Sequence, residues 1–347
     1  MNEATNSKRA TVHDVAREAG VSLATVDRVL NARPGVRQKT IDKVEAAVEK
    51  LNFSRDMSAS MLARSRDIRI TFIMPEGTNQ FMENLAAAIK HQSRQVAAER
   101  IYIGTSFVRA FDSAAFARQL GDLNPENCDC AIVVATDNDV SRDAINDAQK
   151  RGVPVMTLVS DLPGSARRRF IGIDNRAAGR TAGALMGRFC GGSGTIGLIV
   201  GSLDLADHRD RYEGFREIIH QEFPRMRLIG PEEGFDEPGM TGACVSSLVA
   251  DHADLSGIYS MGAGNSGLVE ALEVTARAGQ LHVIAHELTT STRAALKAGT
   301  LDVVLDQNPE GEIRAAIAAA KQLALHAKRD FLGEPIEIGI FLRDNLR

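Results

Sequence analysis

The chain has 347 residues and a formal net charge of −4, and 44% of its residues are hydrophobic. This length and apolar content allow a small domain together with one large or two medium domains. No apolar run reaches membrane-spanning length and the N-terminus lacks a signal-peptide core, so we expect a cytoplasmic protein without a membrane partner. The four cysteines show neither CxxC spacing nor clustered histidines, which predicts reduced thiols and no metal site. They are Cys128, Cys130, Cys190 and Cys244.

Residues 11–31 predict two short amphipathic helices joined by a tight turn. Thr11 and Asp14 have capping-box spacing, and Ser22 can cap the second helix. Gly20 stands where the turn needs positive φ. The apolar positions that can pack inward are Val15, Ala16, Ala19, Val21, Val26, Val29 and Leu30. The pattern is that of a DNA-reading helix-turn-helix, although an ordinary helical hairpin has the same features.

A third helix is predicted over residues 36–51, because Ile41, Val44, Val48 and Leu51 form one apolar stripe. Residues 52–66 are polar, with a weak helix at about 57–64 that has too little apolar surface to fold alone. Residues 1–66 contain 12 Lys or Arg and 8 Asp or Glu, a net charge of +4, and the remainder carries −8. This division assigns contact with phosphates to the N-terminal segment.

Residues 11–66 resemble the DNA-binding region of the LacI family of bacterial regulators. The matching motifs are D-V-A-x-x-A-G-V-S at 14–22, T-V-x-R-V-L-N at 25–31, K-V-x-x-A-x-x-x-L-N-F at 43–53, and Ala59, Leu62 and Ala63. The resemblance implies a helix-turn-helix domain at 10–56 and a hinge helix with linker at 57–66, whose Leu62 wedges into the minor groove. It implies DNA contacts at Ser22, Leu23, Ala24, Thr25, Asp27, Arg28, Asn31, Ala59 and Leu62.

Three residues depart from the family pattern. Asp27 replaces a usual Ser, Arg55 a common Pro, and Met57 a common Arg or Asn. Leu23 and Ala24 can contact only thymine methyl groups, which leaves Arg28 with a guanine as the expected polar base contact.

From Ile68 onward, short apolar runs alternate with helical patterns, as in parallel α/β sheets. Ten strands make two doubly wound lobes, so the fold class is α/β with a three-helix head, a hinge helix and a two-lobed body. The predicted strands are 68–74, 100–107, 130–135, 154–159, 170–174, 195–201, 227–234, 257–261, 282–287 and 302–307. The Gly-rich run at 191–194 precedes a strand, so we interpret it as a helix-ending turn and not as a phosphate cradle.

Residues 262–267 form a G-x-G-x-x-G between a predicted strand and a predicted helix, with Glu287 about twenty residues further on. On pattern alone this is a dinucleotide-binding fingerprint. It favours an alternative function, a dinucleotide-dependent enzyme or redox sensor fused to a DNA-binding head. The motif lies late in the body, whereas the fingerprint normally opens its fold, and we find no nucleophile or acid–base pair. We therefore expect no cofactor and no catalysis.

Residues 68–347 resemble the periplasmic sugar-binding-protein fold, in its ribose-type branch, that LacI-family regulators carry as an effector domain. The motifs are IDNRAAG at 173–179, R-x-x-G-F at 211–215, the loop at Asn265, the strand ending at Glu287 and the crossover at 306–307. The resemblance implies an N-lobe of 68–173 and 308–335 and a C-lobe of 174–307 and 336–347, with the ligand cleft between them.

By the same resemblance, the residues that contact the ligand are Asn79, Phe81, Asp174, Arg211, Phe235, Asn265, Glu287 and Gln307. Structural roles stay open for Arg211 at the surface, Phe235 in the core and Asp174 in a turn, and His208 and His286 are further candidates. The family commonly has Asp where this chain has Glu287. The longer side chain extends further into the cleft, so a smaller or differently substituted polyol is expected as much as a known sugar.

Together these features predict a DNA-binding transcriptional regulator, a repressor that binds a near-palindromic operator as a homodimer. A small polar ligand, a sugar or sugar derivative, switches it. The dimer is expected because one head covers one half-site and paired hinge helices need two chains.

Overall fold

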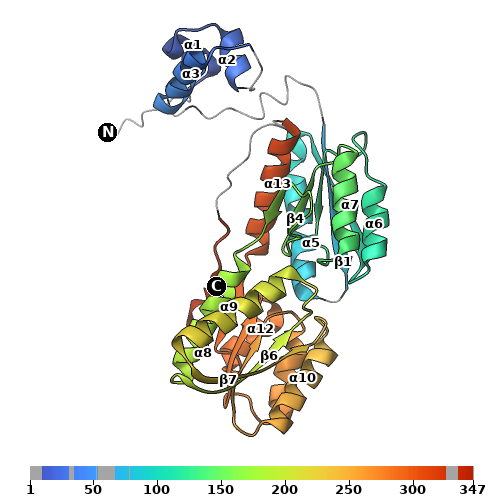
Figure 1. Cartoon of the computed structure of the whole chain (residues 1–347), viewed down its shortest axis with the longest axis vertical. Coiled ribbons are helices and arrows are strands. Elements are labelled where there is room, and N and C mark those ends of the chain that lie inside the picture. Colours follow the sequence, from blue (N-terminus) through green and yellow to red (C-terminus); the bar gives the residue numbers. More distant parts are fainter. Residues whose placement is uncertain are drawn as a thin grey trace, which may run out of the picture. The chain divides into compact units, whose positions relative to one another are not determined.

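The computed structural model describes residues 10–30, 35–51, 53, 67–77, 79–325 and 335–346. The chain forms two compact units, the N-terminal helices and a body that begins at Ile68 (Figure 1). Among the described residues no helix is both long and apolar enough to cross a membrane.

The N-terminal unit contains three helices, α1 (Val12–Ala19), α2 (Leu23–Leu30) and α3 (Gln38–Lys50). The predicted capping box of Thr11 and Asp14 begins α1, and Gly20 ends it in the left-handed conformation at φ 64°. Val15, Val26 and Val44, one from each helix, form the fully buried centre of a small core. The predicted helix-turn-helix is confirmed, and the third helix is slightly shorter than predicted.

The first sheet of the body has the strand order β2-β1-β3-β4-β5, and all its strands are parallel. Its strands are β1 (Ile68–Glu76), β2 (Ile101–Arg109), β3 (Cys130–Val133), β4 (Val155–Leu158) and β5 (Arg169–Ile171). The connecting segments contain α5 (Gln80–Val96), η1 (Ala97–Glu99), α6 (Ser113–Gly121) and α7 (Asp139–Lys150).

The second sheet has the order β11-β10-β9-β8-β6-β7, parallel except for β11, which pairs antiparallel with β10. Its strands are β6 (Ser193–Val200), β7 (Arg225–Glu233), β8 (Leu255–Ser260), β9 (His282–His286), β10 (Val303–Asp306) and β11 (Gly339–Phe341). The helices are α8 (Asn175–Phe189), α9 (Ala206–Glu222), α10 (Pro238–Asp251), α11 (Asn265–Val274), α12 (Thr290–Ala298) and η2 (Arg343–Asn345). All ten predicted strands are confirmed, whereas β11 was not predicted.

The chain passes between the two sheets three times. It leaves the first sheet after β5, returns after β10 through α13 (Pro309–Leu325), and enters the second sheet again at β11. Figure 1 shows α13, in red, beside the first sheet, and Lys321 of α13 forms an ion pair with Glu99. We call the parts around the first and second sheets the N-lobe and the C-lobe; the residue limits predicted for them stay a prediction.

Close packing of α8 on α9 explains the glycine in IDNRAAG. A Cβ on Gly179 would overlap the carbonyl of Arg211, and one on Gly214 would overlap the carbonyl of Arg176. Because these helices touch through their backbones, Arg211 is held at a fixed depth in the C-lobe.

Candidate functional site

The outward face of α2 is apolar at its start and basic further on. Leu23 is 42% exposed, and Ala24 and Arg28 are also exposed, while Asp27 is half-buried. The hydroxyl of Ser22 accepts a hydrogen bond from the amide of Thr25 at 3.1 Å and caps the helix. The predicted contacts at Asn31, Ala59 and Leu62, and the departures at Arg55 and Met57, lie outside the described residues.

In the body, a small polar cavity lies where strand ends of the two lobes meet. It measures about 40 Å³, room for about three water molecules. Many of its lining residues lie just after strand ends, as expected for ligand sites in open α/β sheets, and the others come mainly from the helices α5 and α9. Its polar lining consists of Asn79 and Ser160 from the N-lobe and Asp207, His208, Arg211, Asp236, Glu287 and Gln307 from the C-lobe and the crossover. We call it the inner cavity.

Arg211 is the buried cation of the inner cavity, with 1% of its surface exposed. Its Nε donates to Oδ1 of Asn175 at 2.8 Å, and its Nη1 donates to the carbonyl of Met261 at 2.6 Å. Its Nη2 lies 3.8 Å from carboxylate oxygens of both Asp207 and Glu287 and makes no hydrogen bond to any described residue. The guanidinium is therefore fixed by two bonds, with one nitrogen left for a ligand.

Glu287 is a buried carboxyl group whose backbone takes positive φ, 67°. Its Oε1 accepts a hydrogen bond from Nε2 of Gln307 at 2.7 Å. Burial raises the pKa of Glu287 to about 8, against the opposing effect of Arg211. At neutral pH this carboxyl group is mostly protonated, so it can donate as well as accept.

Four buried side-chain atoms around the inner cavity have no hydrogen-bond partner among the described residues. They are Asp207 Oδ1, Arg211 Nη2, Glu287 Oε2 and Gln307 Oε1. With Glu287 protonated, the set contains two donors and two acceptors. Hydroxyl groups both donate and accept, so this set is complementary to a polyol.

The structure brings five of the eight predicted ligand residues together: Asn79, Phe81, Arg211, Glu287 and Gln307 line the inner cavity. Asp174 does not join them, because it is exposed and its carboxylate caps α8 through the amide of Ala177. Asn265 does not either: its side chain bonds Ser260, the carbonyl of Gly262 and the carbonyl of His286.

Of the two histidines, His208 lines the inner cavity, while His286 is fully buried and bonds the hydroxyl of Tyr259 at 2.8 Å. Sequence reasoning missed Asp207 and Asp236. Asp207 lies four residues before Arg211 on α9, a spacing that places both on one helix face and could have indicated it.

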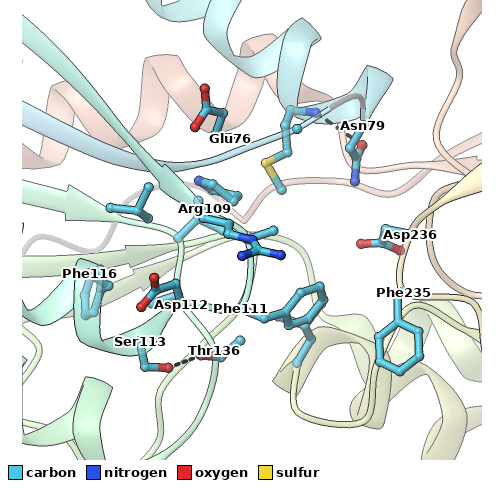
Figure 2. Close-up of a pocket in the computed structure, with 18 of the residues that line it drawn as sticks. Glu76, Asn79, Arg109, Phe111, Asp112, Ser113, Phe116, Thr136, Phe235 and Asp236 are labelled. Carbon is cyan, nitrogen blue, oxygen red and sulfur yellow. Dashed lines mark hydrogen bonds between the residues drawn. The ribbon is translucent and has the colours of Figure 1, made fainter.

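A larger outer cavity of about 360 Å³ adjoins the inner one (Figure 2). The eighth predicted residue, Phe235, lies here instead of in the inner cavity. The two cavities share five lining residues, Asn79, Met82, Val134, Leu205 and Asp236. The two cavities are therefore neighbours between the lobes, a small polar inner one and a wider outer one.

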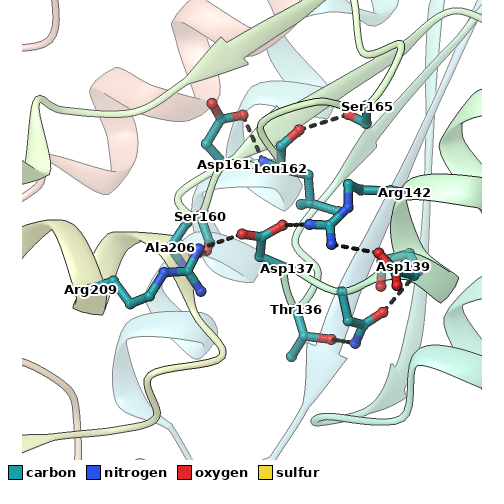
Figure 3. A network of polar contacts seen from close by, with 12 residues as sticks. Thr136, Asp137, Asp139, Arg142, Ser160, Asp161, Leu162, Ser165, Ala206 and Arg209 are labelled. Atoms are coloured by element: carbon teal, nitrogen blue, oxygen red, sulfur yellow. Dashed lines mark hydrogen bonds and ion pairs between the residues drawn. The ribbon is translucent and has the colours of Figure 1, made fainter.

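Direct polar contacts join the lobes beside these cavities (Figure 3). Asp137, which follows β3, forms an ion pair with Arg209 of α9 and a second with Arg142 of its own lobe. Its amide donates to the carbonyl of Asp204 at 2.9 Å. The hydroxyl of Ser160 accepts from the amide of Ala206 at 3.1 Å. These contacts favour the closed arrangement of the lobes.

Changing Asp137 to Asn should make the lobes separate more often. The lost ion pair with Arg209 is partly buried, and we expect a cost of about 1 kcal/mol, or about fivefold in the opening equilibrium. Hydrogen exchange at residues 202–209 should accelerate by that factor. Asp147→Asn, which removes an exposed pair with Lys150, is the control. Unchanged exchange in D137N would show that the pair does not hold the lobes.

The G-x-G-x-x-G loop is packed inside the C-lobe. A Cβ on Gly267 would overlap the carbonyl of Pro238, and one on Gly264 would overlap the hydroxyl of Thr241. The start of α10 thus covers the N-terminus of α11, where a pyrophosphate would have to bind. The glycines are explained by helix packing, and the geometry gives no support to the dinucleotide alternative. No three His, Cys, Asp or Glu residues in the described part of the chain form a metal-binding group.

A helix-turn-helix unit and a two-lobed α/β body with a polar interlobe cavity define a ligand-binding regulatory architecture. Residues 11–56 match the family model for bacterial regulatory proteins of the lacI family, and residues 70–328 match the periplasmic binding protein domain. The chain belongs to the periplasmic binding protein domain family, and its residues 11–56 form a lacI-family domain.

Curated relatives cover part of the chain. The HTH-type transcriptional regulator DegA of Bacillus subtilis is 24% identical over 215 residues, which are 61% of each chain. Catabolite control protein A of Staphylococcus xylosus is 40% identical over 80 residues, 23% of this chain and 24% of the relative. The chain thus matches less than two thirds of the length of these relatives.

Solved structures resemble the body. The glucose-galactose binding protein GanP from Geobacillus stearothermophilus superposes with a TM-score of 0.73 at 20% identity, over 81% of this chain and 99% of that one. A solute binding protein from Burkholderia graminis, solved with D-arabinose, gives 0.75 at 20% identity, over 81% and 96%. At this identity the similarity establishes the fold.

Proposed function

We propose that this protein is a cytoplasmic transcription regulator, a repressor that binds a near-palindromic operator as a homodimer and responds to a small polyol-like effector. One observation carries the proposal. One chain contains both a helix-turn-helix with an exposed DNA-reading face and a body with buried donors and acceptors that lack hydrogen-bond partners among the described residues. The transport proteins that share the body's fold bind sugars such as D-arabinose, which supports a sugar-like effector.

The proposed mechanism is a shift between two arrangements of the lobes. An effector that fills the inner cavity contacts Asn79 from the N-lobe and Arg211 and Glu287 from the C-lobe, so it binds the closed form more tightly than an open one. The shift in operator affinity cannot exceed this difference in effector affinity. The protein binds its effector without transforming it.

The test begins with selection of genomic fragments by the purified protein at near-physiological salt. We expect the retained fragments to share an inverted repeat whose half-sites are related by the two-fold axis of a dimer. Absence of a common repeat, both without and with pooled sugars, would contradict sequence-specific binding. Light scattering of the complex would give its stoichiometry.

Two substitutions should then separate the activities. Arg28→Ala should weaken operator binding by about tenfold or more, because a base contact of Arg contributes about 1–3 kcal/mol, and should leave effector binding unchanged. Gln307→Ala should abolish the effector response and keep operator binding. Gel-shift titrations with and without effector measure both operator affinity and the effector response. They also show whether the effector releases the operator or strengthens its binding. Loss of both activities in either variant would contradict the assignment.

A further inference from the structure

Two half-exposed phenylalanines, one from each lobe, meet at the outer cavity. Phe111 follows β2 in the N-lobe and is 41% exposed; Phe235 follows β7 in the C-lobe and is 44% exposed. Their rings meet edge to face, with centroids 6.3 Å apart and an interplanar angle of 87°. Figure 2 shows both rings at the wall of the cavity. This is an aromatic contact between lobes that depends on how far the lobes are closed.

The backbone of both phenylalanines has an unfavourable conformation. Phe111 has a φ of 63° and Phe235 a φ of 50°, a region that bulky side chains rarely adopt. Such conformations persist where the surrounding structure enforces them, and they cluster at ligand clamps. Asp236, also at positive φ, is fixed by its bond from the amide of Ala263 at 2.8 Å. The loop that carries Phe235 is therefore anchored and presents its ring toward the cavity.

The different sizes of the two cavities indicate a ligand with two parts. The inner cavity, at about 40 Å³, accepts a polar group of only a few heavy atoms, whereas the outer one has about 360 Å³. The outer cavity combines the two rings with polar side chains, among them Arg109 and Asp112, which lie on the same segment as Phe111 (Figure 2). A flat group with one apolar face and a polar edge matches this lining.

We propose that the effector is a two-part ligand: a hydroxyl-bearing head enters the inner cavity, and an attached ring binds against Phe111 and Phe235 in the outer cavity. The ligand class is a glycoside or a similar polyol with a ring substituent, and a simple monosaccharide fills only part of the site. This inference rests on the proposed function, because it assumes that the interlobe cavities bind the effector. The attached ring of the ligand would contact both lobes and thereby add to the preference of the ligand for the closed form.

The experiment compares matched pairs of methyl and phenyl glycosides of common hexoses and pentoses by calorimetry on the full-length protein. We expect at least one phenyl glycoside to bind about tenfold more tightly than its methyl partner, since favourable contacts between aromatic rings add to the affinity beyond the burial of their area. In the double variant Phe111→Ala with Phe235→Ala, the preference should fall below about threefold. Val274→Ala, which shortens an 80% exposed apolar side chain, is the control and should keep it.

The chain contains no tryptophan, so Phe235→Trp supplies a ring and a single fluorescent reporter at once. This variant should retain the phenyl preference, and its emission should change on binding of the phenyl glycosides more than of the methyl ones. Equal affinities within each pair, or a preference that survives the double alanine variant, would overturn the two-part ligand. If glycosides bind, and Gln307→Ala weakens their binding while the Phe variants do not, the proposed function stands and this inference fails. If no glycoside binding depends on Gln307, both fail.

Discussion

Replacing Arg211 with Met should destabilise the body by about 3 kcal/mol near pH 6 and by up to about 5 kcal/mol near pH 8. The guanidinium is 1% exposed and lies between the carboxyl groups of Asp207 and Glu287. Breaking a buried pair by removing one partner costs about 3–5 kcal/mol, because the remaining charge stays uncompensated. At pH 6 Glu287 can be neutral, which reduces that cost; at pH 8 it is substantially ionised.

Urea denaturation followed by circular dichroism at both pH values measures this loss. Arg216→Met is the matched control on the same helix, since Arg216 is 39% exposed and pairs with the exposed Glu213. That change should stay within about 0.5 kcal/mol of the wild type. If R211M were as stable as R216M at pH 8, the buried guanidinium would not compensate the two carboxylates.

The fold was largely predictable from the sequence because its signals are local. Thr11 with Asp14, Gly20 and the stripe that includes Val44 each act within a few residues, and the structure uses them as predicted. The buried parallel strands are continuous apolar runs, so each could be located. The antiparallel β11 has three residues and depends on pairing with β10, a partner more than thirty residues away.

The site was less predictable because polar residues that follow strands have similar sequence surroundings whether or not they face the cavity. Asn265 and Gln307 both follow strands of the C-lobe, yet Asn265 bonds its own loop and the carbonyl of His286, while Gln307 faces Glu287. The choice depends on which neighbouring carbonyls are available, which is a tertiary property. Phe111 gave no signal, since nothing in its loop indicates that Phe235 lies opposite.

Replacing Glu287 with Gln should remove a pH-dependent part of the body's stability. Burial raises the folded-state pKa of Glu287 to about 8, whereas the ordinary value is 4.5. Between these values the folded protein keeps a proton that the unfolded chain releases, so stability falls as pH rises. The contribution is fully present below pH 4.5 and is lost by about pH 8, with a slope of at most about 1.4 kcal/mol per pH unit for one proton.

The quantity to measure is the free energy of unfolding of the wild type minus that of E287Q, from pH 5 to pH 8. We expect this difference to decrease steadily, because Gln has the same shape and does not titrate. Glu312 is also fully buried with a raised pKa and remains in both proteins, so most of its effect cancels in the difference. Glu213→Gln, at an exposed position, is the matched control for the change from Glu to Gln. A flat difference for E287Q would mean that Glu287 is ionised throughout this range. The donor set of the inner cavity would then lose the proton that makes it complementary to a polyol.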